Sequence, residues 1–494
     1  MERCPVPQET RWGRMTDTGC WMFLPDSILC CIMDWKGAVR LLKEFMAKTD
    51  FNECKRCGQC MSVCPVYLTT FREDDVARGK LALLEGVEAG TMTRTPRFQE
   101  ILSRCLLCGA CAHVCASQVQ TNRIIQAGRE RIFEIQKRRQ AENTLLKAVR
   151  EGRLSARMLL KGGALLQALA CKKIPETSGL HLRFPLSYFT ERRTVPPIAW
   201  KPFLDALRSK PSVETEGPRI AFFVGCGANY LFPHVAWALL AILKRLGATP
   251  VVPEGQVCCG LPAYVAGDTR TAQELAKKNI EVFAAFEFDV ILSVCASCGS
   301  QLTSLPSLFA DDPEARDAAS SIATKHMDAM AFLIDHLGFQ KHLTSLQPSK
   351  SEECTNLRVA YHDPCHLRIA QGITEAPRKL LEALPGVKLV EAPHPELCCG
   401  HGGDFNLSHF SLSMEILKRR VADLEKVQPD KIVTGCTGCL LQLGEGVSRS
   451  GLAGTVEVCH PLALAERVIE SCLNPVLRRQ GPPISQAQRT DAAQ

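Results

Sequence analysis

The sequence predicts a helical domain followed by a duplicated α/β domain. Cysteines at short, regular spacings dominate the first part, between residues 54 and 115. From residue 219, a pattern of apolar strands, helices and cysteines occurs twice. Eighteen of the 26 cysteines belong to these two patterns, and 494 residues leave room for two to four domains. The cysteine patterns therefore divide the chain.

The first cysteine pattern consists of two runs with one spacing. They are Cys54-x2-Cys57-x2-Cys60-x3-Cys64-Pro65 and Cys105-x2-Cys108-x2-Cys111-x3-Cys115. Bacterial ferredoxins use this spacing for two [4Fe–4S] clusters, and the fourth cysteine of each run ligates the other cluster. We therefore assign one cluster to Cys54, Cys57, Cys60 and Cys115, and the other to Cys105, Cys108, Cys111 and Cys64. Zinc motifs do not place three cysteines in a row in this way.

The two runs are separated by a long helical stretch. Helical patterns over 75–84 and 96–102 fill the gap between Cys64 and Cys105. Small β-type ferredoxins use much shorter insertions, so we expect an all-helical two-cluster ferredoxin domain.

The repeated part predicts parallel α/β layers. In each copy an apolar strand ends at a cysteine, a helix follows, and a second strand leads to Cys-Cys-Gly. A longer helix (272–286 or 412–427) and a third strand (289–294 or 431–434) then lead to Cys-x2-Cys. Alternating strands and helices indicate a parallel sheet, and such sheets bind ligands past the carboxyl ends of their strands. The copies are about 140 residues apart, which indicates an internal duplication.

Each copy contributes five cysteines to a second kind of site. Two adjacent thiolates and three others suit a site with five sulfur ligands, and Gly260 and Gly400 let the backbone turn closely there. A zinc site, or thiols without metal, are the alternatives. The ten predicted metal ligands are Cys226, Cys258, Cys259, Cys295 and Cys298 in the first copy, and Cys365, Cys398, Cys399, Cys436 and Cys439 in the second.

These patterns set the expected domain boundaries. Residues 1–35 show little periodicity and are either a disordered extension or precede the true start at Met33 or Met46. The other expected parts are the helical 2x[4Fe–4S] ferredoxin domain 36–120, a basic helical region and proline-rich linker 121–218, the Cys-Cys-Gly (CCG) domains 219–350 and 351–475, and a flexible tail 476–494.

Composition excludes several classes of protein. A disulfide-rich secreted domain would be short, whereas this chain is long and has metal-type cysteine spacings. Thiolate ligands to iron need a reducing compartment, which predicts the cytoplasm. We find no run of 18 apolar residues and no secretory signal. No Gly-x-Gly-x-x-Gly element follows a strand, so we expect any flavin on a partner subunit.

The net charge of +7 is concentrated in one region. Residues 123–173 hold 13 Lys and Arg against 4 Asp and Glu. Leucines, not aromatic residues, alternate with the basic ones, which does not fit a nucleic-acid surface. Peripheral contact with the inner face of the cell membrane, docking of a partner, and a solvated helix face are the three interpretations.

The full layout resembles the iron–sulfur subunits of glycolate oxidase and related D-lactate dehydrogenases. It also resembles the iron–sulfur subunit of anaerobic glycerol-3-phosphate dehydrogenase and the CCG-containing subunit of heterodisulfide reductase. The resemblance covers about residues 45–470. Besides the two cysteine runs, the motifs that carry it are Val224-Gly-Cys226, Cys258-Cys-Gly260, Cys295-Ala-Ser-Cys298, His362-Asp-Pro-Cys365-His, Cys398-Cys-Gly-His-Gly-Gly403 and Gly435-Cys-Thr-Gly-Cys439.

This resemblance implies an electron-transfer subunit with no catalytic residue of its own. An FAD-binding partner would oxidise a 2-hydroxy acid such as glycolate or D-lactate, and this chain would pass the electrons to a quinone or another carrier. One or two further iron–sulfur clusters, of the non-cubane [4Fe–4S] type in heterodisulfide reductases, would occupy the CCG domains. Many glycolate oxidase subunits lack some CCG cysteines, but this chain keeps all ten.

Two alternatives follow from the same motifs. Non-cubane clusters in the CCG domains would themselves reduce a disulfide in a heterodisulfide-reductase-type subunit. A zinc-holding scaffold or regulatory protein is the weaker alternative. Three histidines lie beside the motif cysteines, and we expect packing or turn roles for them rather than hydrogen bonds to a cluster; they are His362, His366 and His401.

Overall fold

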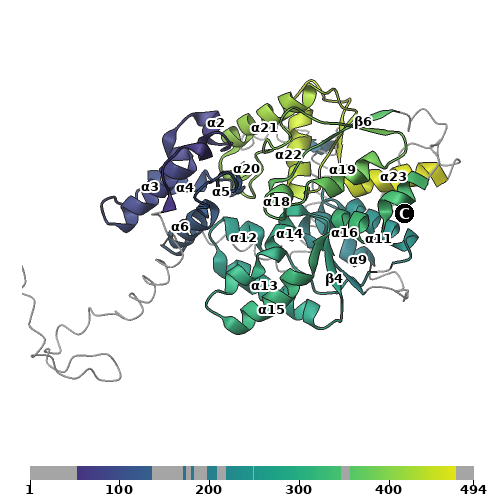
Figure 1. Cartoon of the computed structure of the whole chain (residues 1–494), viewed down its shortest axis with the longest axis horizontal. Coiled ribbons are helices and arrows are strands. Elements are labelled where there is room, and N and C mark those ends of the chain that lie inside the picture. Colours follow the sequence, from purple (N-terminus) through teal and green to yellow (C-terminus); the bar gives the residue numbers. More distant parts are fainter. Residues whose placement is uncertain are drawn as a thin grey trace, which may run out of the picture. The chain divides into compact units, whose positions relative to one another are not determined.

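The computed structural model describes residues 53–135, 171–173, 180–182, 197–207, 219–248, 250–345 and 356–473 (Figure 1). The predicted extension 1–35, most of the basic region and linker, and the tail 476–494 lie outside these ranges. Among the described residues, no helix is long and apolar enough to cross a membrane.

Residues 53–135 form helices and loops, without a strand in this described part. The helical segments are η4 Gln59–Met61, α2 Tyr67–Thr70, η5 Glu73–Asp75, α3 Ala77–Glu88, α4 Pro96–Ser103, α5 Ala110–His113 and α6 Thr121–Ile135. Helix α4 begins where the Thr95 hydroxyl accepts a hydrogen bond from the Phe98 amide, with Pro96 in the first turn. Helix α6 packs on α3 and α4, and Gly128 leaves the room that Leu84 occupies.

The first CCG repeat contains a parallel sheet of order β3-β4-β5. Its strands are β3 Ile220–Phe223, β4 Val290–Ser293 and β5 His326–Asp328. The predicted second strand is reduced to one bridge between Ala221 and Val251. Pro250 and Pro253 flank this bridge, and proline cannot donate a hydrogen bond to a neighbouring strand.

The second CCG repeat has the complete version of the same sheet. Its order is β7-β6-β8-β9, with every pair parallel. The strands are β7 Val387–Val390, β6 Leu357–Tyr361, β8 Lys431–Val433 and β9 Glu457–Cys459. With the Val251 bridge counted, the two sheets have equivalent strand orders, so the predicted duplication of a parallel α/β unit is confirmed.

Helices follow the strands in both repeats, close to the predicted ranges. The first repeat and the segment before it contain α9 Phe203–Leu207, α10 Gly225–Tyr230, α11 Pro233–Arg245, α12 Leu261–Val265, α13 Thr269–Ala284, α14 Ala296–Thr303, η6 Leu305–Phe309, α15 Pro313–Lys325, α16 Ala329–Asp335 and α17 Phe339–Ser345. The second contains α18 Cys365–Arg368, α19 Glu375–Glu382, α20 Phe405–Ser408, α21 Phe410–Glu425, α22 Thr437–Ser448 and α23 Pro461–Leu473. Strand β1 Cys171–Lys173 pairs antiparallel with β2 Leu180–Leu182.

Helices of the two repeats pack against each other, and the repeats share one apolar core. Helix α16 of the first repeat packs on α19 of the second, and α23 of the second packs on α11 of the first. Equivalent side chains cap α16 and α23: Asp328 accepts from the Met330 amide, and His460 accepts from the Leu462 amide. This reciprocal packing places the carboxyl ends of the two sheets, where the motif cysteines lie, at a common junction.

Candidate iron–sulfur sites

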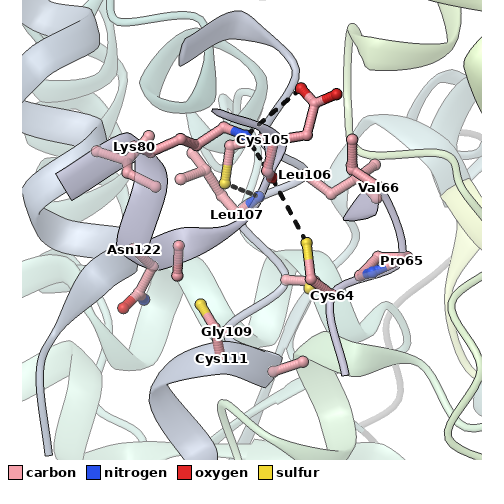
Figure 2. A pocket seen from close by; sticks show the side chains of 15 residues that line it. Cys64, Pro65, Val66, Lys80, Cys105, Leu106, Leu107, Gly109, Cys111 and Asn122 are labelled. Atoms are coloured by element: carbon pink, nitrogen blue, oxygen red, sulfur yellow. Dashed lines mark hydrogen bonds and ion pairs between the residues drawn. The ribbon is translucent and has the colours of Figure 1, made fainter. Parts of the chain in front are cut away.

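The eight cysteines of the helical part line two cavities. Cys54, Cys57, Cys60 and Cys115 line one of them. Cys64, Cys105 and Cys108 line the other, and Cys111 borders both (Figure 2). The fourth cysteine of each run therefore lies with the first three of the other run, which is the grouping that the spacing predicts.

Left-handed backbone residues shape both cysteine loops in the same way. Arg56 and Gly58 flank Cys57 with φ values of 53° and 89°. Leu107 and Gly109 flank Cys108 with φ values of 51° and 77°. These turns bring backbone amides towards the sulfur atoms, as shown by the Leu107 amide 3.4 Å from Cys105 Sγ. Amide donors of this kind tune clusters held by thiolates.

Burial controls the protonation of these thiols. Burial raises the pKa of Cys64 to about 11. Burial, followed by the neighbouring Cys398, raises the pKa of Cys108 well above its usual value. Because iron is bound by the thiolate form, metal binding must displace these protons.

Each CCG repeat brings its five cysteines together from three elements. In the first repeat, α10 carries Cys226, the loop before α12 carries Cys258 and Cys259, and α14 begins after Cys295. Cys226 Sγ and Cys258 Sγ lie 3.8 Å apart. In the second repeat a different pair is close: Cys399 Sγ, from the cysteine pair, and Cys439 Sγ lie 3.3 Å apart.

The glycines after the cysteine pairs have the left-handed conformation that the motif predicts. Gly260 and Gly400 have φ values of 89° and 85°. A Cβ on Gly400 would lie 2.8 Å from the Ser413 carbonyl oxygen, and one on Gly260 would lie 3.2 Å from the Ala272 carbonyl oxygen. The close approach that requires glycine is therefore to α13 in the first repeat and to α21 in the second.

The two five-cysteine sets meet at the junction of the repeats. Cys295 Sγ lies 3.2 Å from the Thr437 hydroxyl of the second repeat. Cys436 Sγ lies 3.2 Å from the Ser297 hydroxyl of the first repeat. Hydrogen bonding between Cys295 and Cys436 raises the pKa of Cys436 to about 11. In each set, one cysteine thiol therefore contacts a hydroxyl group from the other repeat.

The ferredoxin part docks on the second repeat at the cysteines. Val66 and Leu106 form a small apolar cluster with Phe405 and Ile416, against which Cys64, Cys108 and Cys398 pack. A Cβ on Gly402 would lie 2.3 Å from Leu106 Cδ2, so only glycine allows this close approach. The cavity around Cys108 is thus next to the cysteines of the second repeat.

All three histidines singled out in the sequence lie against sulfur sites. His362 is buried, and a ring nitrogen, Cys399 Sγ and Cys439 Sγ all lie within 4.8 Å of one another. His366 Nδ1 lies 3.0 Å from the Ser297 hydroxyl. A Cβ on Gly438 would lie 2.7 Å from the His401 ring. His401 packs on Gly438 and also hydrogen-bonds with the Gln442 side chain, so all three histidines make polar contacts.

Burial and a neighbouring buried arginine lower the pKa of His362. Arg420 Nε donates to His362 Nδ1 at 3.1 Å, and Arg420 is itself fully buried. Burial lowers the pKa of His362 well below its usual value, and Arg420 lowers it further. The neutral ring therefore carries its proton on Nε2, because Nδ1 is the acceptor.

Comparison with known proteins identifies the family. A cysteine-rich domain (CCG) matches residues 220–303 and 359–444, and a 4Fe-4S dicluster domain matches residues 50–119. The chain is 31% identical over 437 residues to the probable glycolate oxidase iron-sulfur subunit of Bacillus subtilis (strain 168), covering 87% of this chain and 96% of that protein. The chain belongs to the glycolate oxidase iron–sulfur subunit family.

Other relatives of this family also match. A subunit of the fumarate reductase (CoM/CoB) of Methanothermobacter marburgensis is 28% identical over 429 residues, which cover 84% of this chain and 71% of that protein. The lactate utilization protein of Geobacillus kaustophilus is 31% identical over 233 residues, which cover 47% of this chain and 93% of that protein. The family resemblance inferred from the motifs is confirmed.

A member of the glycolate oxidase iron–sulfur subunit family with these domains binds multiple iron–sulfur clusters. The donor sets fit this requirement. All eighteen motif cysteines are free thiols, and they are grouped in two cavities and two five-cysteine sets. Thiolates are the ligands that such clusters use.

Sequence reasoning missed four residues that shape these sites. Ser297 and Thr437 stand inside the Cys-x2-Cys motifs, so their position was a usable signal. Arg420 and Lys80 had no comparable signal, because each lies in a helix whose other residues follow an ordinary amphipathic pattern. Only the packing of the chain shows that both are buried beside cysteines.

Proposed function

We propose that the chain is the electron-transfer subunit of a flavin-dependent 2-hydroxy-acid dehydrogenase. An FAD-binding partner would oxidise glycolate or D-lactate, and this chain would pass the electrons to a quinone or another carrier. The observation that carries the proposal is the unbroken series of cysteine sets from the helical part, through the second repeat, to the first. The names of the similar proteins from Bacillus and Geobacillus support the substrate class.

We propose the following ligand sets for this series. The first ferredoxin cluster would be held by Cys54, Cys57, Cys60 and Cys115, and the second by Cys64, Cys105, Cys108 and Cys111. The CCG sites would use Cys226, Cys258, Cys259, Cys295 and Cys298, and Cys365, Cys398, Cys399, Cys436 and Cys439. The close sulfur pairs and shared cavities support these sets.

Clusters bound in these sets would supply one-electron chemistry, with potentials set by charge, hydrogen bonds and exposure. The chain itself would determine the order and the burial of the clusters. In the proposed series the order is first cavity, second cavity, second repeat, first repeat, and the burial of most CCG thiols supports it. The two ends of this order, near Cys57 and near Cys226, are where we expect electrons to enter and leave.

The relay is tested by removing its third set. We would purify the chain anaerobically with its flavoprotein and compare the complex with one that carries Cys398→Ser and Cys399→Ser. Hydroxy-acid oxidation with an artificial dye should survive, whereas quinone reduction should be lost. Cys472→Ser is the control, because this thiol lies in α23, outside the four sets. Full quinone reduction by the double variant would refute the proposed path.

One observation favours a second function. Both repeats keep all five cysteines grouped, and the chain resembles a subunit of the fumarate reductase (CoM/CoB). A heterodisulfide-reductase-type subunit would reduce a disulfide at these sets without a hydroxy-acid flavoprotein. Disulfide reduction by the chain with a reduced dye, abolished by Cys398→Ser, would favour this function over the relay.

We also propose the finer features of the fold and location. The helices of residues 53–135 support the all-helical type of ferredoxin domain. The reducing environment that iron thiolates need supports the cytoplasm, with peripheral membrane contact through residues 123–173. Changing Arg138, Arg139, Arg150 and Arg153 to Glu should release the chain from washed membranes, and unchanged partitioning would refute the contact.

A further inference from the structure

A lysine is buried at the wall of one ferredoxin cavity. Lys80 is 1% exposed and lines the second cavity together with Cys64 and Cys105 (Figure 2). Its Nζ donates to the carbonyl oxygens of Asp74, at 3.3 Å, and of Asp75. It also lies 3.8 Å from the Asp75 carboxylate. Two carbonyl acceptors and a nearby carboxylate, beyond hydrogen-bond distance, surround this nitrogen, as suits an ammonium group.

A second buried cation lies behind the same cavity. Arg129 of α6 donates to the carbonyl oxygens of Leu102, at 2.8 Å, Ser103, at 3.0 Å, and Cys105. It also donates to the Val265 carbonyl oxygen in the first CCG repeat, at 2.7 Å. Its guanidinium is therefore fixed beside the backbone of a proposed ligand, where water does not screen it.

Only part of this positive charge is compensated nearby. Asp75 is the buried carboxylate next to Lys80, and Arg104 also pairs with it, at 3.3 Å. Glu100 pairs with Arg104 but is 43% exposed. Asp404, which is partly exposed, also acts on Arg129. Among the residues that the structure describes, the buried charges at this cavity are thus two cations and one anion.

The first cavity has cations of a different kind. Arg56 and Arg78 line it, but their side chains are 68% and 28% exposed, and each pairs with a surface glutamate. Solvent and salt screen such pairs strongly, whereas a charge in the interior acts through a low dielectric. An uncompensated buried cation stabilises the more negative, reduced form of a nearby centre.

We propose that Lys80, together with Arg129, makes the centre held by Cys64, Cys105, Cys108 and Cys111 the higher-potential one of the ferredoxin pair. Electrons in this part of the chain then collect on the side that faces the second CCG repeat. Lys80 acts through its positive charge on the neighbouring centre, and it touches no substrate. The inference rests on the proposed ligand sets and relay, and it adds a direction to the relay.

The test is a redox titration of the isolated chain, followed by electron paramagnetic resonance. Lys80→Gln keeps a hydrogen-bond donor but removes the charge, so one ferredoxin midpoint should fall while the other stays. Lys80→Arg should restore it. Arg56→Gln, at the exposed cation of the first cavity, is the matched control and should shift either midpoint much less. Cys105→Ser and Cys54→Ser assign the two signals by their loss.

Asp75→Asn provides an independent variant of opposite sign. It removes the buried anion with almost no change in shape, so the same midpoint should rise. Unchanged midpoints in Lys80→Gln with full iron content, or a fall in Asp75→Asn, would overturn the inference. No flavoprotein is used, so failure of the relay itself would appear separately, as lost coupling to the partner with these shifts intact.

Discussion

At the residue scale, the two CCG repeats differ three residues before the first motif cysteine, at the end of the strand that leads to it. The sequence alignment of the repeats places Phe223 opposite His362. Phe223 packs on Phe283 in the first core, whereas His362 accepts a hydrogen bond from the buried Arg420. The second repeat therefore holds a polar pair beside Cys399 and Cys439 where the first has an apolar contact.

Replacing His362 with Phe should destabilise the chain. The Arg420 Nε–H would lose its acceptor in the interior, which costs about 1–3 kcal/mol. Thermal unfolding of the loaded chain measures this loss. His394→Phe is the control, because the His394 side chain is 59% exposed. Equal melting temperatures for the two variants would contradict the role given to the buried pair.

Gly400 allows a second residue-scale prediction. Gly400→Ala combines a left-handed φ of 85° with a Cβ 2.8 Å from the Ser413 carbonyl oxygen. Gly372 has a φ of 68° and nothing within 4 Å of its added Cβ. Left-handed strain alone costs about 1–2 kcal/mol, so Gly400→Ala should lower stability and iron retention more than Gly372→Ala. Denaturation and iron analysis measure the difference; identical effects would show that the close approach is unimportant.

At the element scale, α6 ties the ferredoxin part to the first CCG repeat. Gln126 donates to the Tyr264 carbonyl oxygen and Arg129 to that of Val265. A Cβ on Gly267 would lie 2.7 Å from the Arg129 carbonyl oxygen, so the two backbones approach closely. A helix that follows the last ferredoxin cysteine thereby fixes the cysteine loops against the next domain.

The contribution of this helix can be measured with two arginines. Arg129→Met leaves several buried carbonyl oxygens without a donor, and we expect a loss of about 3–5 kcal/mol, as for other broken buried charge networks. Arg131→Met is the matched control on the same helix, because Arg131 pairs with Glu88 near the surface, where pairs contribute about 0–1 kcal/mol. Chemical denaturation compares them. A loss of similar size in both would contradict the anchoring role.

At the scale of the whole molecule, the ferredoxin part contacts both repeats, but its cysteines face the second. At Gly402 the backbone approaches Leu106 so closely that an added Cβ would lie 2.3 Å from Leu106 Cδ2. The cysteine set of the second repeat meets that of the first repeat at Cys436 and Cys295. This arrangement supports the linear order of sites that we propose for the relay.

Gly402→Ala should disturb this order without removing a ligand. The added Cβ would collide with Leu106, separate the docked surfaces and slow quinone reduction by the complex. Leu106→Ala in the same chain opens the required space and should restore part of the rate. Stopped-flow reduction and cluster spectra measure both. An unchanged rate in Gly402→Ala, with intact spectra, would contradict an electron path through this contact.

The sequence by itself determined the duplicated parallel α/β unit, and it predicted thiolate ligands with an interlocked ferredoxin grouping. Each depends on local spacing or on a periodic pattern, as in the cysteine runs and the strands before Cys226 and Cys365. Tertiary structure alone decided which sites are neighbours and which charges are buried. Lys80 and Arg420 sit in ordinary helical patterns, and the meeting of Cys295 with Thr437 joins residues 142 positions apart. Burial and long-range contact depend on how the elements pack, and no local pattern encodes that packing.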